Sequence, residues 1–356
     1  MKICIGILAW NEEGSIHTTL RSLLDQSLIT GLADNGHDLE LICVPNGCTD
    51  NTAKTARRAF AAAPQTVRWR VEELKTPSKT NAWNVFVHEL SNPDTELFFL
   101  MDADIRIQEK DTLSNMVTAL TAHPDLLTCS DRPIKHVALK KHYTLLDKIS
   151  LHASKLTADA DGQLCGQLYC ARAGFLRRFR IPDTIIVDDG FIKKMAVTNL
   201  LTEPDDSARR MTTAENASHL FESYTRFADV FSTQRRQAAG YIIHRWTWEF
   251  LLDQQQENED AGKTIDRLHT ADPDWSKKLI ASRLKERKCR DILRVILRTR
   301  VQRFKNTTGA KKVLQFPLLL LHLTMDAVVF SAAVRQLRRN GRIWRDTRTT
   351  HNEVAR

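Results

Sequence analysis

Short apolar runs alternate with amphipathic segments through the first third of the chain. The runs typical of β-strands are residues 2–9, 39–44, 66–71 and 96–101. The segments with apolar residues at helical spacing are residues 14–26, 50–62 and 79–90. Repeated strand–helix units of this kind predict a parallel sheet with right-handed crossovers.

After residue 104 the alternation becomes irregular. The pattern predicts helices at 113–122, 140–156 and 174–179, and strands at 126–130 and 167–172. From residue 227 onward it is almost wholly helical, with no clear strand signal. The 356 residues suffice for one large α/β domain with an appendage, or for two domains.

The apolar run at 97–101 ends abruptly in two carboxylates, Asp102 and Asp104. A run this short and this rich in Phe and Leu is typical of a strand buried on both faces. Ligands of open α/β sheets bind beyond the carboxyl ends of the strands, and hard divalent ions prefer oxygen ligands. The pair therefore predicts a metal site that holds a nucleotide diphosphate. Taken alone, an acidic strand end without a ligand is the simpler interpretation.

Two segments after the first strands carry further candidate chemistry. Trp10 offers a flat face on which a base could stack, or it is a core aromatic residue. Asn46 and Gly47 are typical of a tight turn, and Thr49 or Asp50 is a good cap for the helix that follows. The alternative for this second segment is a plain strand–turn–helix connection.

Two later segments carry charged candidates. Asp188 and Asp189 are adjacent, and burial beside a like charge raises a carboxyl pKa toward the range of a general base. Without context, a pair of acids at a helix start is the simpler interpretation. Arg235 and Arg236 could neutralise a leaving diphosphate, or they form an ordinary solvated turn.

Taken together and in order, these segments resemble the family 2 glycosyltransferases of the GT-A fold. The matching stretches are 8–13, 44–52, 79–84, 102–104, 166–179, 188–189 and 234–236. Each motif is weak, but the ordered set is specific, and it favours the metal-site interpretation of the strand end at 102–104. The resemblance covers about residues 1–245.

The resemblance implies a catalytic domain at residues 1–245 with a mixed, mostly parallel sheet flanked by helices. Residues 246–356 would form a basic, helical C-terminal region. The implied activity is transfer of a sugar, with inversion, from a nucleotide-diphosphate sugar to an acceptor hydroxyl. A UDP-sugar is the expected donor and Mn²⁺ or Mg²⁺ the expected cofactor.

The resemblance also assigns roles to residues. Asp104 and Asp102 would hold the metal, and Asp189, beside Asp188, would take the proton from the acceptor. The residues expected at the donor are Ala9, Trp10, Asn11, Glu13, Asn46, Lys79, Asp102, Gln234, Arg235 and Arg236.

This sequence departs from the family pattern at three places. Pro45 stands where an aspartate usually contacts the uracil, so the base of the nucleotide stays open. Gln237 and Ala238 replace the last two residues of the Gln-x-x-Arg-Trp motif, which argues against a processive polymer synthase. Ser78, rather than Gly, precedes Lys79.

Composition and charge bear on the partners and the location. The chain is 42% hydrophobic and 27% charged, which predicts a globular core. Its net charge is +9, with Lys and Arg concentrated at 283–303 and 335–348, as expected for contact with anionic lipid or nucleic acid. Seven cysteines without zinc-site spacing predict small buried thiols in a reducing compartment. The apolar run at 3–10 is too short for a signal peptide, so a cytoplasmic location is expected.

The segment at 313–334 is the most apolar long stretch. Its 22 residues could span a bilayer, but Gln315, His322 and Asp326 interrupt it, and basic clusters flank both ends. We expect a helix that lies in the inner membrane interface or packs on the catalytic domain. Residues 341–348 resemble the stretch after the membrane segment of some lipid-directed family members, which favours a membrane-proximal acceptor. A glycan or lipid-linked acceptor is therefore expected.

Three other function classes are compatible with parts of the sequence. A nucleotidyltransferase would carry a Gly-rich, basic loop after the first strand, where this chain has Trp10 followed by Asn-Glu-Glu. A nucleic-acid binder fits the charge, but the sequence has no recognised binding motif, so no nucleic-acid partner is expected. A catalytically inactive family relative is the third alternative, because of Pro45.

Overall fold

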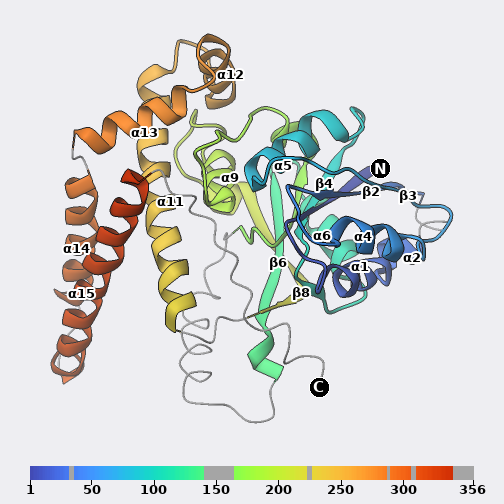
Figure 1. The fold of residues 1–356 in the computed structure, drawn as a ribbon, viewed down its shortest axis with the longest axis horizontal. Helices are drawn as coiled ribbons and strands as arrows, with labels where there is room; N and C mark the ends of the chain where they lie inside the picture. Colours follow the sequence, from blue (N-terminus) through green and yellow to red (C-terminus); the bar gives the residue numbers. More distant parts are fainter. Residues whose placement is uncertain (32–35, 140–163, 223–226, 287–288, 306–309, 340–356) are drawn as a thin grey trace.

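The computed structural model describes residues 1–31, 36–139, 164–222, 227–286, 289–305 and 310–339. A sheet with helices on both faces forms one part, and a group of long helices stands beside it (Figure 1). The helix expected at 140–156 lies outside the described residues.

The strand–helix units expected in the first third are confirmed. They are β1 (Lys2–Ala9), α1 (Ile16–Leu24), α2 (Ser27–Thr30), β2 (Asp38–Pro45), α4 (Thr52–Phe60), β3 (Arg68–Val71), α5 (Lys79–Val85), the π-helical turn η1 (Phe86–Leu90) and β4 (Leu97–Asp102). The N-cap of α4 is Asn51, so the expectation of Thr49 or Asp50 as the cap is wrong. Asp50 still supports the start of the helix, because its Oδ1 accepts a hydrogen bond from the Thr52 amide at 3.0 Å.

The rest of the sheet-bearing part is more irregular. Its elements are β5 (Arg106–Ile107), α6 (Thr112–Thr121), β6 (Thr128–Lys135), η2 (His136–Leu139), β7 (Leu168–Arg172), α8 (Ala173–Leu176), α9 (Asp188–Val197), α10 (Ser207–Arg210) and β8 (Met211–Phe221). The sequence pattern misses β5 and β8. In β8 the exposed Asn216 has a φ of 50°, and the register with β6 shifts between Ser130 and Arg132. This irregularity breaks the period of two that would identify a strand.

The eight strands form one sheet in the order β3-β2-β1-β4-β7-β6-β8-β5. β1 pairs in parallel with β2 and with β4, while β7 runs antiparallel to both β4 and β6. The expected mixed, mostly parallel sheet flanked by helices is therefore confirmed. The carboxyl ends of β1, β2 and β4 meet at one edge, which is where an open α/β sheet binds ligands.

The core has two layers, one on each face of the sheet. Alternate residues of β1 enter different layers: Ile5 packs with the layer that includes α1, α4 and α6, whereas Cys4 packs with the layer beneath α5, α9 and α11. Gly6 faces the second layer, where an added Cβ would lie 2.7 Å from the Phe86 ring. This close approach allows the helical turn carrying Phe86 to lie against the central strand.

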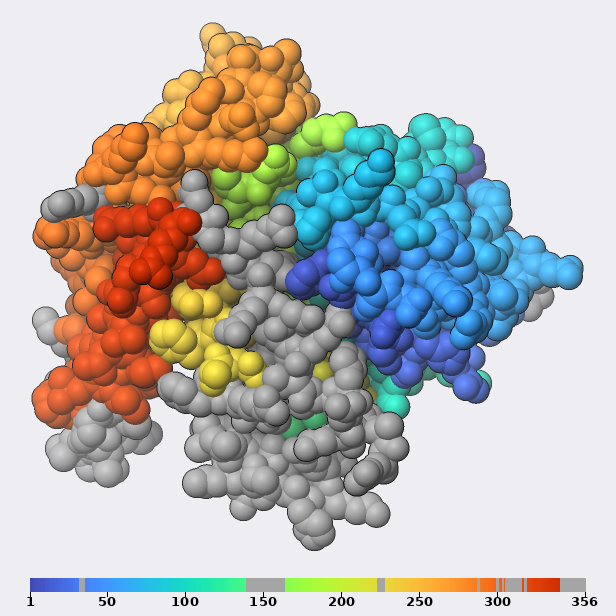
Figure 2. All heavy atoms as spheres, viewed as in Figure 1, coloured from blue at the N-terminus to red at the C-terminus, as the bar shows by residue number. Residues whose placement is uncertain are grey.

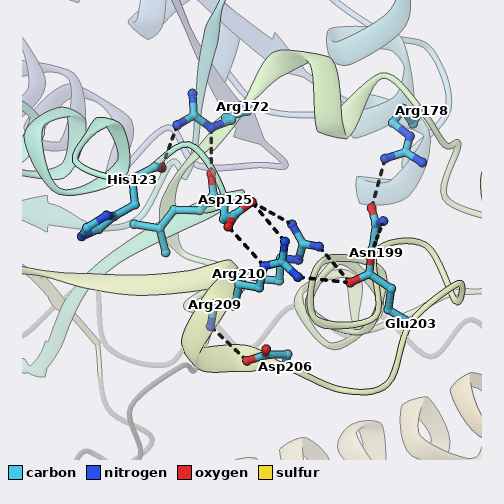
Figure 3. A network of polar contacts seen from close by, with 10 residues as sticks. His123, Asp125, Arg172, Arg178, Asn199, Glu203, Asp206, Arg209 and Arg210 are labelled. Carbon is cyan, nitrogen blue, oxygen red and sulfur yellow. Dashed lines mark hydrogen bonds and ion pairs between the residues drawn. The ribbon is translucent and has the colours of Figure 1, made fainter.

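An ion-pair network fixes the C-terminal side of α9 (Figure 3). The buried Arg210 donates to Glu203 Oε2 at 2.8 Å, and its neighbour Arg209 contacts Asp125 at 3.2 Å. Glu203 follows α9, and Asp125 precedes β6. The network therefore connects the end of α9 to the beginnings of β6 and β8, and so helps to hold the helix that carries Asp188 and Asp189 at its other end.

The C-terminal region is helical, as expected. It comprises α11 (Phe227–Gln254), α12 (Ala261–Ala271), α13 (Trp275–Lys285), α14 (Cys289–Lys305) and α15 (Ala310–Arg338). α11 is continuous across the boundary predicted at residue 245, and its Ile242 and Trp246 are buried in the same core layer as the sheet. α14 and α15 lie side by side and form one edge of the molecule in Figure 2.

Candidate active site

Asp102 and Asp104 lie at the end of β4, on the edge where the parallel strands end. The Asp102 amide donates to the Gln167 carbonyl at 2.9 Å, and Thr19 Oγ1 donates to the Ala103 carbonyl at 2.8 Å. These bonds fix the backbone between the two carboxylates. Burial and the charge of Asp104 raise the pKa of Asp102 to about 6, even though Lys79 acts in the opposite direction. Asp104 is exposed, but desolvation by the surrounding protein raises its carboxyl pKa as well.

Asp188 and Asp189 form the first turn of α9, so the two interpretations of this pair are compatible. Burial, followed by the charge of Asp188, raises the pKa of Asp189 to about 6. Asp189 Oδ1 accepts a hydrogen bond from the Gly190 amide at 2.6 Å. Gly166 lies against this side chain, since an added Cβ there would be 2.8 Å from the Asp189 Cβ. The carboxylate is therefore held in one place and ionises near neutral pH.

Lys79 connects the two acidic pairs. Its Nζ lies 2.8 Å from Asp102 Oδ1 and 3.5 Å from Asp188 Oδ2. Burial alone would lower the pKa of Lys79, but the carboxylates outweigh it and raise that pKa above its ordinary value. The side chain therefore stays charged, and it brings the strand end at 102–104 together with the start of α9.

Asn46 positions the elements around Lys79. Its amide Nδ2 donates to the Ala9 carbonyl at 2.7 Å, and its Oδ1 accepts from the Ser78 amide at 3.1 Å. Ser78 is the N-cap of α5, and its Oγ accepts from the Asn81 amide at 3.2 Å. Both ends of the buried Asn46 side chain are thus bonded within the chain, and they join β1, β2 and the start of α5.

The loops after β1 and β2 are held to each other by side chains expected at the donor. Asn11 Oδ1 accepts from the Thr49 amide at 2.7 Å, and Glu13 Oε2 accepts from the Asn51 amide at 2.7 Å. Trp10, which directly precedes Asn11, is half-buried. The loops beside the strand ends are therefore preorganised.

The basic candidates lie near the start of α11. Gln234 is exposed, while Arg235 is half-buried and its Nη2 lies 3.5 Å from Ser232 Oγ. Arg236 is close enough to Asp189 for its positive charge to oppose the rise in that carboxyl's pKa. Among these three residues, Arg236 is the one whose charge acts on the carboxylate of Asp189.

A cleft beside Asp189 contains residues that the sequence patterns did not identify. It has a volume of about 210 Å³ and is lined by Leu164, Val187, Asp189, Gly190, Lys193, Gln237, Tyr241 and His244. Burial lowers the pKa of His244 to about 4, so its imidazole is neutral. Gln237, Tyr241 and His244 are spaced three or four residues apart on α11. Once the helix is known, this spacing predicts that they lie on the same face.

A second polar cluster lies behind Asp104 and was also missed. His219 Nδ1 and Asp131 Oδ2 are 2.7 Å apart and fully buried, and His219 Nε2 lies 3.3 Å from Gln167 Oε1. With Cys165, these groups could surround a metal ion, since their ligand atoms lie within 4.8 Å of one another. Burial raises the pKa of the Cys165 thiol to about 12 in the protein alone. The contacts of His219 with Asp131 and Gln167 join β6, β8 and the start of β7. No local pattern connects residues this far apart in sequence.

Residues 4–180 match the family model described as glycosyl transferase family 2. Mannosyltransferase PcManGT from Pyrobaculum calidifontis, solved with GDP-Man and Mn²⁺, has a similar structure with a TM-score of 0.55. That match has 17% identity and covers 96% of this chain and 88% of that chain. No curated protein sequence matches.

Two further solved structures are less similar. S. aureus TarS with UDP has 14% identity, coverage of 97% of this chain and 94% of that chain, and a TM-score of 0.47. Glucosyl-3-phosphoglycerate synthase from Mycobacterium tuberculosis, with Mn²⁺, UDP and phosphoglyceric acid, has 16% identity, coverage of 68% and 78%, and a TM-score of 0.47. Such identities establish the fold alone, and TM-scores below 0.5 support no functional comparison.

Proposed function

Because residues 4–180 match the glycosyl transferase family 2 model and the chain has the GT-A fold, we propose that the protein is a metal-dependent inverting glycosyltransferase. The observation that carries the proposal is the pairing of two acidic sites through one lysine. Asp102 lies at the strand end, Asp188 at the start of α9, and Lys79 contacts both. One pair can hold the donor, and the other can activate the acceptor.

The donor side of the proposal is a nucleotide-diphosphate sugar bound with Mn²⁺ or Mg²⁺. Asp104 and Asp102 would hold the ion, which when bound neutralises charge on the diphosphate. The residues fit a hard cation, because they offer two carboxylates one residue apart. Their pKa values are raised first of all by burial, so a bound cation would favour their ionised forms. A UDP-sugar is the expected donor. A GDP-sugar is the alternative, given Pro45 and the GDP-Man complex of the mannosyltransferase.

On the acceptor side, Asp189 would take the proton from the attacking hydroxyl. A pKa of about 6 leaves this carboxylate ionised at neutral pH and basic enough to accept a proton as the hydroxyl attacks. Attack on the anomeric carbon from the face opposite the diphosphate inverts its configuration. Arg236, with Arg235, would stabilise the departing nucleoside diphosphate.

A donor screen with product analysis tests this activity. Wild-type protein is incubated with UDP- and GDP-sugars, Mn²⁺ and a panel of glycan and lipid-linked acceptors. NMR of the product should show inverted anomeric configuration. Asp189→Asn should reduce transfer by about 100-fold or more while leaving donor affinity nearly unchanged. If Asp188→Asn is the more damaging change, the base is assigned to the wrong member of the pair.

We also propose peripheral contact with the inner, anionic face of a membrane, where a lipid-linked or glycan acceptor would be found. The helix at Leu319–Arg338 is long and apolar enough to cross a bilayer by composition. Its later part packs on the protein, however, since Phe330 and Ala333 are buried. The earlier part of α15 exposes Phe316, Leu320, Leu321 and Val328. A helix that is exposed in its earlier part and buried in its later part is better suited to lie at the membrane surface than to cross the bilayer.

Co-sedimentation with vesicles tests the membrane proposal. Leu321→Glu should weaken binding to vesicles that contain phosphatidylserine. The matched control is Leu252→Glu, an equally exposed leucine on α11. Equal binding of both variants would contradict contact through α15.

A further inference from the structure

Hydrogen bonds at the start of α5 hold the backbone of Lys79 in place. Lys79 begins α5, directly after the N-cap Ser78, and the Ser78 amide is held by the buried Asn46. The side chain therefore leaves a rigid helix start and reaches between β4 and α9. Its ammonium has one carboxylate from each acidic pair within 3.5 Å.

These charges are largely withdrawn from water. The exposed fractions of the side chains are 18% for Lys79, 25% for Asp102 and 12% for Asp188. Poor screening strengthens both the attraction to the ammonium and the repulsion among the carboxylates. In the absence of a bound cation, Lys79 therefore neutralises part of the negative charge of these carboxylates.

A divalent cation on Asp102 and Asp104 would share Asp102 with this ammonium. Two cations on one carboxylate repel each other, so the lysine opposes binding of the metal alone. The oxygens of a diphosphate attract both cations and would relieve the repulsion. Lys79 should therefore weaken the binding of the metal ion alone. It should strengthen the binding of the metal ion and the diphosphate together.

We propose that Lys79 is an internal counter-cation that makes the binding of a divalent cation and of a nucleoside diphosphate mutually dependent. This inference rests on the proposed function, and it adds a coupling role to the donor contact expected for Lys79. It predicts effects of opposite sign in one variant, which a simple donor-binding or structural role would not produce.

The test is a Mn²⁺ titration followed by EPR of the free ion, with and without UDP or GDP. For wild type, the diphosphate should tighten Mn²⁺ binding by about fivefold or more. For Lys79→Met, Mn²⁺ alone should bind roughly tenfold more tightly than to wild type, because the repulsion is gone. The same variant should bind the diphosphate more weakly, and the coupling factor should fall toward one.

Two variants and a second readout control for folding and for net charge. Lys79→Arg keeps the charge and should retain the coupling. Lys54→Met removes an exposed lysine from α4 and should bind both ligands like wild type. In thermal unfolding, Mn²⁺ should raise the melting temperature more for Lys79→Met than for wild type, because the variant begins with uncompensated carboxylates.

The outcomes separate the two proposals. If wild type binds Mn²⁺ and diphosphate but Lys79→Met binds Mn²⁺ no more tightly, or keeps the full coupling, the role of Lys79 is overturned and the glycosyltransferase proposal stands. If wild type binds neither Mn²⁺ nor either diphosphate, both proposals fail.

Discussion

Replacing Gly166 by alanine tests how closely Asp189 must be positioned. The added methyl group would lie 2.8 Å from the Asp189 Cβ and 3.2 Å from its Cγ and Oδ2. Non-bonded carbon atoms prefer separations of about 3.5 Å or more, so the carboxylate must move by roughly 0.7 Å. A displacement near 1 Å can cost about 100-fold in rate, and we expect kcat to fall by about 10- to 100-fold.

The assay is steady-state release of nucleoside diphosphate at saturating donor and acceptor, with donor affinity measured by calorimetry. Affinity should stay near the wild-type value, because Gly166 lies against Asp189 rather than against Lys79 or Asp102. Gly174→Ala is the matched control, since a Cβ there meets nothing within 4 Å, and it should leave kcat unchanged. A Gly166→Ala enzyme with wild-type kcat would refute the reasoning.

Four further predictions concern the pH dependence of transfer, the stability cost of Asp189, the strand ends and the contact between helices. Transfer should fall about tenfold between pH 7 and pH 5, because Asp189, whose pKa is about 6, becomes protonated over this range, and a flat pH–rate profile would contradict its role as base. The raised folded-state pKa makes ionised Asp189 a stability cost above pH 6 that is relieved as the pH falls, so Asp189→Asn should raise the free energy of unfolding by about 1–2 kcal/mol at pH 8 and by less at pH 5, as urea denaturation would show. Asn46→Ala leaves the half-buried Ser78 amide and the buried Ala9 carbonyl with one partner fewer, and should lower the free energy of unfolding by about 1–3 kcal/mol and weaken donor binding; unchanged stability would argue against its bracing role. Gly240→Ala would place a methyl group 2.5 Å from Val187 Cγ2, so it should separate α11 from α9 and lower both the melting temperature and kcat, and an unchanged melting temperature would count against this packing.

The parts of the fold that follow a local period could be predicted from the sequence. β1 and β4 are short apolar runs, and the carboxylates at the end of β4, Asp102 and Asp104, are visible as a short motif in the sequence. β8 could not be found this way, because it is stabilised by pairing with β6 and is interrupted at Asn216. Its apolar and polar positions do not alternate regularly enough to identify a strand.

The candidate site divides in the same way. Asp102, Asp104, Asp188 and Asp189 were identified from neighbours in sequence. The contact of Lys79 with Asp188 and the approach of Gly166 to Asp189 depend on how β4, α5 and α9 meet in space. The buried pair of Asp131 and His219 joins residues 88 positions apart, so only the tertiary structure could reveal it.

The most direct test of the central claim is metal-dependent release of nucleoside diphosphate from a panel of nucleotide sugars. Wild type should release it from at least one donor with Mn²⁺ or Mg²⁺, and chelation with EDTA should abolish the release. Asp104→Ala should lose about 100-fold or more of this rate, whereas Asp94→Ala, which removes an exposed aspartate at the opposite end of β4, should retain it. Release from no donor, or equal release by Asp104→Ala and wild type, would contradict the account.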